Sequence, residues 1–312
     1  MRPFAGKVLS LLEVRRLTHR SGDCALCRTE LCSFFGGYLE LITLCLMNSS
    51  ASNKTAPNPE RLGRNHGRYG GETIDIATVL EECIQAADSD WRHERISAAD
   101  EVSLEMLRLA QPGARKRIYL SAGIHGDEPA GPLAVRELMR KKCWRKDVDV
   151  WLCPCLNPTG FPLNRRESAA GLDLNREYHA PTALETVAHV AWLKLQPDFD
   201  TSICLHEDWE AQGFYLYELN LSGRPSPAEA IIERVENVCP IDYSEIIEGR
   251  AARGGIVRPN ADPLSRPQWP EAFYLLQNHT RHSYTLEAPS DFPLATRVEA
   301  LVIAVQTIIE SL

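Results

Sequence analysis

One stretch constrains the fold more than any other: an apolar run that ends in a histidine and leads directly into a helix start. Residues 117–124 (RIYLSAGI) carry the β-branched and aromatic side chains typical of a buried strand. His125 and Glu128 follow, and Pro129 suits a first helical turn, where no backbone N–H is needed. A spacing of three residues brings the imidazole and the carboxylate to one side of the turn. Such a pair can bind zinc if a third ligand comes from elsewhere, although a bare H-x-x-E is also common in ordinary loops.

Length and composition describe an ordinary globular chain. The 312 residues are 44% hydrophobic and 24% charged, which allows one large α/β domain or two small ones. The formal net charge of −8 argues against nucleic acid as a partner. No apolar run reaches the roughly 18 residues of a membrane-spanning helix. Cys153, Cys155 and Cys204 lie in expected core strands, which favours reduced thiols and a cytoplasmic location.

The start of the chain differs from the rest, because a basic stretch with a C-x-x-C pair precedes an apolar run. A signal peptide, a zinc knuckle and a dispensable extension before an alternative start at Met47 are the three interpretations. The long basic part and the interruption at Glu40 argue against a signal peptide, although they leave secretion open. The cysteines lack the paired spacing of a knuckle. We therefore expect a dispensable extension at 1–46, a linker or surface arm at 47–72 and the main domain at 73–312.

Within the main domain, strand and helix patterns alternate. Helices are expected at 74–87, 131–142, 182–195, 227–238 and 296–312, and strands at 101–110, 117–124, 148–156, 201–205, 213–219 and 283–286. This order predicts an α/β fold with a mixed, largely parallel twisted sheet and helices on both faces. The turn at 111–113 indicates a hairpin between the first two strands. The pair Thr182 and Glu185 predicts a capping box, and residues 251–270 are expected to be a long irregular loop.

Further polar residues follow the ends of expected strands. His206 ends the strand at 201–205 and can complete a His–Glu–His set with one open position, the pattern of a catalytic zinc site. Glu207 or Asp208 can orient a ligating imidazole. The last strand delivers Glu287 at its end.

A polar segment at 165–176 (RRESAAGLDLNR) follows another strand end, where open α/β sheets bind ligands. Its arginines, together with Asn175, can hold a carboxylate by fork geometry, but spacing alone does not separate this interpretation from a solvated loop. In the later loop, Arg253, Arg258 or Trp269 can line a pocket, although no spacing requires it.

The combined order resembles a known enzyme group. H-x-x-E, then R-x-x-x-x-G-x-D-x-N-R, then a strand-end His and a strand-end Glu resembles the zinc carboxypeptidases of the carboxypeptidase A type, across about residues 117–290. The overall size is similar to bacterial members such as the murein tripeptide amidases. The resemblance implies that residues 73–312 form a zinc carboxypeptidase-like catalytic domain. It also implies one zinc ion per chain, bound by His125, Glu128 and His206.

The same resemblance implies roles for the other polar residues. Arg166 would face the oxyanion of the scissile carbonyl, and Glu287 would be the general base. Asn175 and Arg176 would hold the terminal carboxylate of a peptide, which implies a metallocarboxypeptidase.

Two features depart from that group. Thr159 stands where many members have an acid in the turn Asn-Pro-Asp-Gly. The tyrosine that many members place on a mobile loop has no clear counterpart, and Tyr274 and Tyr284 are the available candidates.

Two alternatives stay open. A zinc deacylase of N-acyl amino acids, similar to succinylglutamate desuccinylase and aspartoacylase, would share the same zinc residues and the late glutamate. A non-catalytic binding module would keep the pocket without turnover. The expected partner is a peptide or N-acyl amino acid with a free carboxylate, and neither nucleic acid nor a membrane; the oligomeric state is open.

Overall fold

The computed structural model describes residues 59–64, 71–99, 102–259 and 265–312. The extension expected at 1–46 lies outside these residues, as does most of the arm at 47–72. The predicted division of the chain at these positions therefore stays a prediction.

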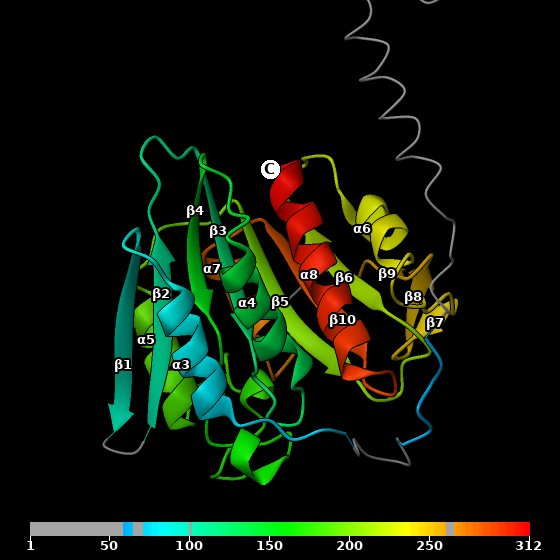
Figure 1. Cartoon of the computed structure of the whole chain (residues 1–312), viewed down its shortest axis with the longest axis horizontal. Helices are drawn as coiled ribbons and strands as arrows, with labels where there is room; N and C mark the ends of the chain where they lie inside the picture. Colours follow the sequence, from blue (N-terminus) through cyan, green and yellow to red (C-terminus); the bar gives the residue numbers. More distant parts are fainter. Residues whose placement is uncertain (1–58, 65–70, 100–101, 260–264) are drawn as a thin grey trace, which may run out of the picture. The chain divides into compact units, whose positions relative to one another are not determined.

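A single mixed sheet runs through the described part of the chain (Figure 1). Its strands are β1 (Trp91–Ala99), β2 (Val102–Leu109), β3 (Lys116–Ala122), β4 (Val148–Cys153), β5 (Thr201–Asp208), β6 (Tyr215–Asn220), β7 (Ile246–Ile247), β8 (Arg250–Arg253), β9 (Ile256–Val257) and β10 (His282–Pro289). Their order across the sheet is β1-β2-β4-β3-β5-β10-β6-β9-β8-β7. The centre, β4-β3-β5-β10, is parallel, and most of the outer pairs are antiparallel.

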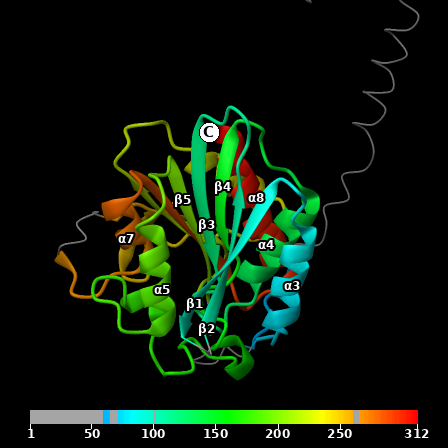
Figure 2. The same cartoon turned by 90° about the vertical axis from the view of Figure 1, so that its left-hand side faces the viewer.

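Helices cover both faces of this sheet. They are α3 (Ile76–Ala86), α4 (Ala130–Lys141), α5 (Leu184–Leu193), α6 (Ala228–Val235), α7 (Glu271–Asn278) and α8 (Leu294–Ser311). Helices α3, α4, α8 and α6 pack side by side on one face, whereas α5 and α7 lie on the other (Figures 1 and 2). The expected α/β fold, a mixed sheet with helices on both faces, is confirmed. The largely parallel part of the sheet is its centre.

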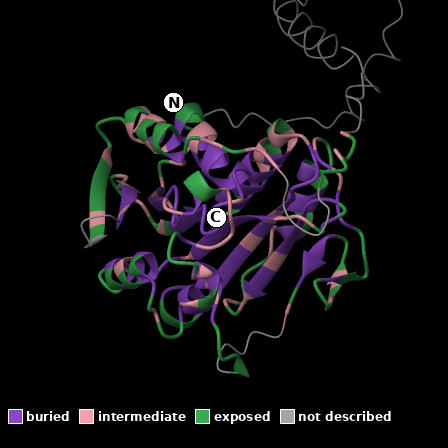
Figure 3. Cartoon of the chain, turned by 90° about the horizontal axis from the view of Figure 1, so that it is seen from below, coloured by how far each residue is buried: buried purple, intermediate pink, exposed green. Residues whose placement is uncertain are grey.

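Each helical layer encloses its own apolar core. Successive strand residues point to opposite faces, so Leu120 of β3 joins the core beneath α4 and α8, while Tyr119 joins the core beneath α5 and α7. Figure 3 shows the central strands as buried along nearly their whole length. Strands covered on both faces leave their two ends available for polar residues, and the carboxyl end is where ligands bind in such sheets.

The predicted hairpin between residues 101–110 and 117–124 is wrong. β2 pairs with β1 and β4, and β4 lies between β2 and β3. The sequence analysis did not assign β1, whose run WRHERISAA lacks a regular apolar alternation. Nearness in sequence therefore suggested a pairing that the inserted strand β4 prevents.

Two further expectations need correction. Residues 251–270 are not entirely irregular, because they include most of β8 and all of β9. The capping box at Thr182 and Glu185 does not form: α5 starts after Ala183, and the Thr182 hydroxyl donates to Glu177 Oε2 at 2.5 Å. Among the described helices, none is long and apolar enough to cross a membrane.

Candidate metal site and active-site cavity

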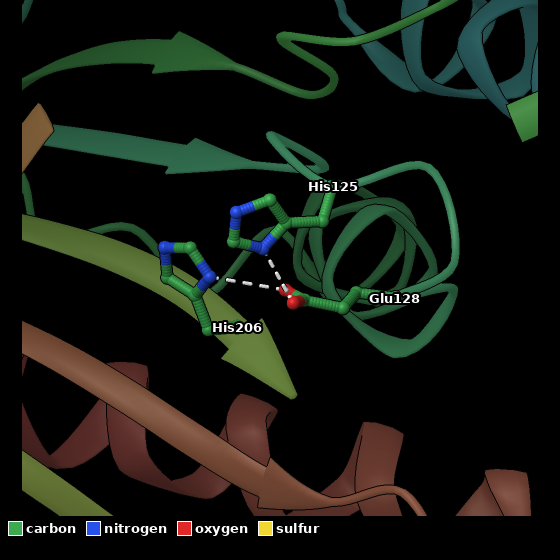
Figure 4. Close-up of side chains that lie close together, drawn as sticks. All are labelled: His125, Glu128 and His206. Carbon is green, nitrogen blue, oxygen red and sulfur yellow. Dashed lines mark hydrogen bonds and ion pairs between the residues drawn. The ribbon is translucent and has the colours of Figure 1, made fainter. Parts of the chain in front are cut away.

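Two histidines and a glutamate meet at the carboxyl edge of the parallel strands. His125 follows β3, Glu128 lies just before α4, and His206 lies in β5, the neighbour of β3. Because β3 and β5 are parallel, their carboxyl ends reach the same edge of the sheet. His125 Nδ1 lies 2.5 Å from Glu128 Oε1, and His206 Nδ1 lies 3.0 Å from Glu128 Oε2 (Figure 4). All three side chains are buried.

This group fits a zinc ion. One ligand atom from each residue lies within 4.8 Å of the others. Two imidazole nitrogens and one carboxylate oxygen form a typical catalytic zinc set, with one position left for water or substrate. Burial by itself opposes the negative charge of Glu128, but His125 and His206 lower its pKa on balance. The carboxylate is therefore ionised and able to bind a cation.

Asp173 lies behind the first histidine, a role that the sequence analysis did not assign. Its Oδ1 is 3.3 Å from His125 Nε2, within ion-pair distance although not aligned as a hydrogen bond. Burial opposes its charge, but contacts with His125 and Arg166 lower its pKa on balance. A carboxylate in this place fixes which ring nitrogen faces a metal. The signal was present in the sequence, because Asp173 is the acid of the G-x-D-x-N-R segment.

Glycine at position 126 allows the H-x-x-E turn to touch the next loop. A Cβ on Gly126 would lie 2.3 Å from the carbonyl carbon of Gly160 and 2.5 Å from the nitrogen of Phe161. The Gly126 N–H donates to the carbonyl oxygen of Arg166. The turn that carries His125 and the loop that carries Arg166 therefore fit together only without a side chain here.

Glu287 lies beside the candidate ligands. It occupies the position of β10 that is in register with His206 of β5, and it lines the same cavity. Burial raises the pKa of Glu287 well above its ordinary value, and the negative charges of Glu128, Asp208 and Glu248 raise it further. A carboxyl group beside the candidate metal ligands is placed to take up and return a proton, as a general base must.

Arg166 is held by two acids and still reaches the cavity. Its Nε donates to Asp173 Oδ2 at 2.9 Å, and its Nη1 lies 3.7 Å from Glu128 Oε1. The side chain is 39% exposed and lines the cavity. A guanidinium in this position is available to an anionic group near the metal site.

Asn175 and Arg176 form a short 3₁₀ turn at another part of the cavity wall. Asn175 Oδ1 accepts a hydrogen bond from the N–H of Glu271 at 2.9 Å. Since a backbone N–H can only donate, the amide oxygen must face this partner and the amide NH₂ is left for other contacts. Arg176 is exposed, and its Nη1 donates to the backbone oxygen of Asn175 at 2.9 Å.

Glu207 and Asp208 have partners other than a ligating imidazole. Glu207 Oε1 accepts from the N–H of Ala130 at 2.5 Å, and its other oxygen pairs with Arg297. Asp208 accepts from the hydroxyl of Tyr215 at 3.1 Å. The expectation that either acid orients a histidine ring is therefore not met; Glu207 instead ties the start of α4 to β5.

The residues singled out from the sequence line one cavity of about 570 Å³. They are His125, Glu128, Arg166, Asn175, Arg176, His206 and Glu287. A cavity of this size accepts a small molecule or the end of a peptide. The structure thus brings together residues that are separated by more than half of the chain.

Other residues line this cavity that the sequence analysis missed. They include Arg250, Arg266, Tyr217 and Glu248. Tyr217 donates from its hydroxyl to Glu248 Oε2 at 2.5 Å. Glu248 and Gly249 both have positive φ, 48° and 72°, in the two-residue turn between β7 and β8. Such a turn is favourable in a hairpin but unusual for glutamate, and it brings Glu248 to the cavity.

The arginines and the tryptophan suggested from the later loop lie elsewhere. Neither Arg253, Arg258 nor Trp269 is among the cavity-lining residues. Arg258 donates to Glu218 Oε2 at 2.8 Å.

The two candidate tyrosines also lie away from the cavity wall. Tyr274 and Tyr284 are buried, and Tyr284 donates to Glu218 Oε1 at 3.2 Å. Tyr217 is the tyrosine that lines the cavity, and its sequence context, an alternating strand, gave no reason to select it.

Residues 114–219 match the family model of the succinylglutamate desuccinylase/aspartoacylase catalytic domain. This segment contains all three candidate zinc ligands. Among curated proteins, none matches the chain.

Solved structures share the fold at low sequence identity. A protein described as a metallopeptidase from Shewanella denitrificans has a TM-score of 0.66 and 18% identity, covering 79% of this chain and 98% of its own. A second, from Shewanella amazonensis, has a TM-score of 0.65 and 22% identity, with coverages of 76% and 92%. A metallo-carboxypeptidase from Pseudomonas aeruginosa, in complex with (2-guanidinoethylmercapto)succinic acid, has a TM-score of 0.55 and 18% identity, with coverages of 75% and 67%.

The segment match and the shared fold confirm the resemblance to the zinc carboxypeptidase-like group and its succinylglutamate desuccinylase/aspartoacylase branch. The buried His–Glu–His group lies within the matched segment and is of a kind that can bind a metal ion.

Proposed function

We propose that this protein is a zinc-dependent hydrolase that removes the C-terminal residue of a short peptide. The observation that carries the proposal is the shared cavity: a buried His–Glu–His set, a glutamate with a raised pKa and two carboxylate-binding candidates all line it. His125, Glu128 and His206 would hold the metal. When bound, zinc supplies an acidified water and polarises the scissile carbonyl.

Two residues carry the chemistry near that centre. Glu287 accepts a proton from the attacking water and returns it to the leaving amine, which its place in the cavity beside His206 supports. Arg166 presents its guanidinium to the oxyanion that develops on the carbonyl, and its pairing with Asp173 fixes the side chain for this contact. One such donor typically stabilises a transition state by about 3–4 kcal/mol.

Asn175 and Arg176 select the substrate. The NH₂ of Asn175 and the exposed guanidinium of Arg176 bind the terminal carboxylate of the peptide. Because this contact needs a free carboxylate next to the cleaved bond, the enzyme acts on chain ends and not on internal bonds.

Two further arginines favour a substrate whose C-terminal residue is acidic. Arg250 and Arg266 line the cavity together with Arg176, and none of the three forms an ion pair with a carboxylate among the described residues. Burial and the positive charges of Arg250 and Arg176 lower the pKa of Arg266. Glu248 offsets part of this repulsion. Guanidinium groups that repel one another and form no ion pair among the described residues favour a second carboxylate on the substrate, such as that of a C-terminal glutamate or aspartate.

A zinc deacylase that cleaves N-acyl amino acids is the second candidate. The family match over residues 114–219 favours it, and it would use the same ligands and the same glutamate. The arginines would then bind the carboxylates of an N-acyl acidic amino acid.

A mass-spectrometric substrate screen tests both candidates. Purified protein, with and without chelator, is incubated with peptides that end in acidic or neutral residues and with N-succinyl and N-acetyl amino acids. We expect chelator-sensitive loss of one C-terminal residue, fastest for acidic ends. Cleavage of the small N-acyl amino acids alone would assign the protein to the deacylases. Absence of both metal and hydrolysis would contradict an enzymatic role and favour a binding module.

A further inference from the structure

A buried carboxylate lies beneath the cavity and has no part in the proposed reaction. Glu271 is the first residue of α7 and is only 1% exposed. Its chain neighbours Pro270 and Ala272 line the cavity, and so does Cys204 of β5, whereas Glu271 does not. Its side chain therefore occupies the layer directly behind the cavity wall.

The carboxylate of Glu271 is hydrogen-bonded to two side chains of strand β3. The Tyr119 hydroxyl donates to Glu271 Oε1 at 2.9 Å, and Ser121 Oγ donates to Oε2 at 2.9 Å. Both donors are buried. Hydrogen bonds to both oxygens leave the carboxylate little freedom to rotate, so the start of α7 is held at a fixed distance from β3.

The hydrogen bonds continue behind Tyr119. His189 Nε2 lies 2.8 Å from the Tyr119 oxygen, and His189 Nδ1 lies 2.7 Å from the hydroxyl of Tyr178. Burial lowers the pKa of His189 to about 3, so its ring is neutral and has one donor and one acceptor nitrogen. Because Tyr119 donates to Glu271, His189 Nε2–H donates to Tyr119 and Nδ1 accepts from Tyr178. Every hydrogen bond in this series then runs in one direction, from donor to acceptor, and the series ends on Glu271.

The same residue also contacts the candidate substrate-binding asparagine. The N–H of Glu271 donates to Asn175 Oδ1 at 2.9 Å, which turns the asparagine NH₂ away from α7. Glu271 thus joins two contacts: its side chain anchors it to β3, and its backbone orients Asn175. A shift of this residue would move the asparagine amide directly.

We propose that Glu271 is a positioning residue for carboxylate recognition, which ties the start of α7 to β3 and thereby holds the Asn175 amide ready for the substrate. This inference rests on the proposed function, since it takes Asn175 as a substrate-binding residue. Glu271 acts through Asn175; it contacts none of the three candidate metal ligands in the structure.

Two substitutions of Glu271 distinguish a positioning role from a role of its negative charge. Glutamine at position 271 can keep every contact if the chain reverses: its NH₂ donates to Tyr119, Tyr119 donates to His189 Nε2, and His189 donates from Nδ1 to Tyr178. Alanine at this position removes the acceptor of Ser121 and the link between α7 and β3, and buried polar groups that lose a partner are costly. A positioning role therefore predicts that glutamine preserves function and alanine does not.

The test compares kcat and KM for one peptide with a free C-terminal carboxylate and for the same peptide with a C-terminal amide. The variants are Glu271→Ala, Glu271→Gln, Ser121→Ala and Asn175→Ala. We expect Glu271→Ala to raise KM for the free-carboxylate peptide about tenfold, with kcat within about threefold, and to reduce the preference over the amide about tenfold. Glu271→Gln should stay within about threefold of the unmodified protein in every value.

Glu218→Ala is the matched control. Glu218 is also a buried glutamate, 3% exposed, with a tyrosine hydroxyl and a histidine as partners, but it does not line the cavity. Its loss should lower stability and leave the preference for the free carboxylate unchanged. If Glu271→Ala fails to fold, Ser121→Ala decides, because it removes one anchor of the carboxylate and should reduce the preference about threefold.

The outcomes distinguish this inference from the proposed function. If Glu271→Ala and Ser121→Ala keep the full preference while Asn175→Ala loses it, the positioning role is overturned and the proposed function stands. An equal loss of kcat on both peptides in Glu271→Ala would likewise mean a merely structural role. If Asn175→Ala keeps the full preference, or the unmodified protein cleaves neither peptide, the proposed function fails, and this inference fails with it.

Discussion

Glu287 and its neighbours define what single side chains contribute to the reaction. Glutamine at position 287 keeps the shape of the side chain but cannot accept a proton from water. We expect Glu287→Gln to lower kcat by about 10³-fold and to leave the zinc content unchanged, since Glu287 is not one of the three grouped ligands. Turnover by mass spectrometry and metal by elemental analysis check this. Full turnover in the variant would refute the assignment of the base.

Glu271 also predicts how stability depends on pH. Burial raises its pKa from 4.5 to about 7, so the folded protein holds this proton over a range in which the unfolded chain has released it. The stability linked to this group is therefore fully present below about pH 4.5 and is lost as the pH rises through about 7. Glu271→Gln should remove this pH dependence, which amounts to on the order of 2 kcal/mol in the free energy of unfolding. Urea unfolding at about pH 5 and about pH 7.5 measures it; equal slopes in both proteins would contradict the prediction.

Sequence reasoning found some site residues and missed others for a physical reason. His125, Glu128 and His206 follow expected strands directly, so local pattern alone places them at the carboxyl edge of the sheet. Arg250 lies just before the region 251–270 that was expected to be an irregular loop, and Arg266 lies within it. Their place at the cavity depends on how that region pairs with the far edge of the sheet, which no local pattern specifies.

Among the elements, the turn between β3 and α4 has little room for a larger residue. Any Cβ at position 126 meets the backbone of Gly160 and Phe161, which cannot swing aside as a flexible side chain could. We expect Gly126→Ala to push the H-x-x-E turn away from the loop of Arg166 and to weaken zinc binding at least tenfold. Titration of the metal-free protein with zinc measures this. Unchanged zinc affinity in the variant would contradict this prediction.

The β7–β8 hairpin offers a second test at this scale. Arg250 lies at the start of β8 and lines the cavity, whereas Arg253 at the end of the same strand is exposed and does not. Arg250→Gln should raise KM for peptides with acidic C-terminal residues about tenfold and change KM for neutral ones less than twofold. Arg253→Gln should change neither. An equal effect of Arg250→Gln on both substrate types would argue against a carboxylate-binding role.

The hairpin that was wrongly expected between β2 and β3 shows what limits prediction of whole elements. The periods of both strands are visible in the sequence, and both strands form. Their pairing is decided by β4, which arrives later in the chain and inserts between them. Segment type follows from local chemistry, but partner choice depends on contacts that are distant in sequence.

For the whole molecule, metal binding and folding are expected to be coupled. The three candidate ligands come from the end of β3, the start of α4 and the body of β5, so a bound ion would connect these elements. Addition of zinc to chelator-treated protein should raise Tm by several degrees, on the order of 2–4 kcal/mol of stabilisation at a large excess over Kd. His206→Ala should abolish the increase. An equal increase in that variant would mean that zinc stabilises the protein at another place.

The fold class followed from the alternation of strand and helix patterns, because an apolar strand such as 148–156 requires cover on both faces. The order of ten strands did not follow, since the antiparallel additions at both edges of the sheet depend on long-range pairing. The cavity lies where the parallel centre of the sheet meets one of these unpredicted edges.

Arg297 of α8 gives the segment before the first helix an unexpected importance. Its guanidinium is fully buried and pairs both with Glu207 of β5 and with Glu72, which precedes α3. Glu207 in turn donates its N–H to Glu128 Oε2 at 3.1 Å. A protein engineer who trims the chain to begin at α3 would therefore remove one acid that pairs with the buried Arg297, which is connected through Glu207 to the candidate zinc ligand Glu128. Safe trimming must leave Glu72 in place.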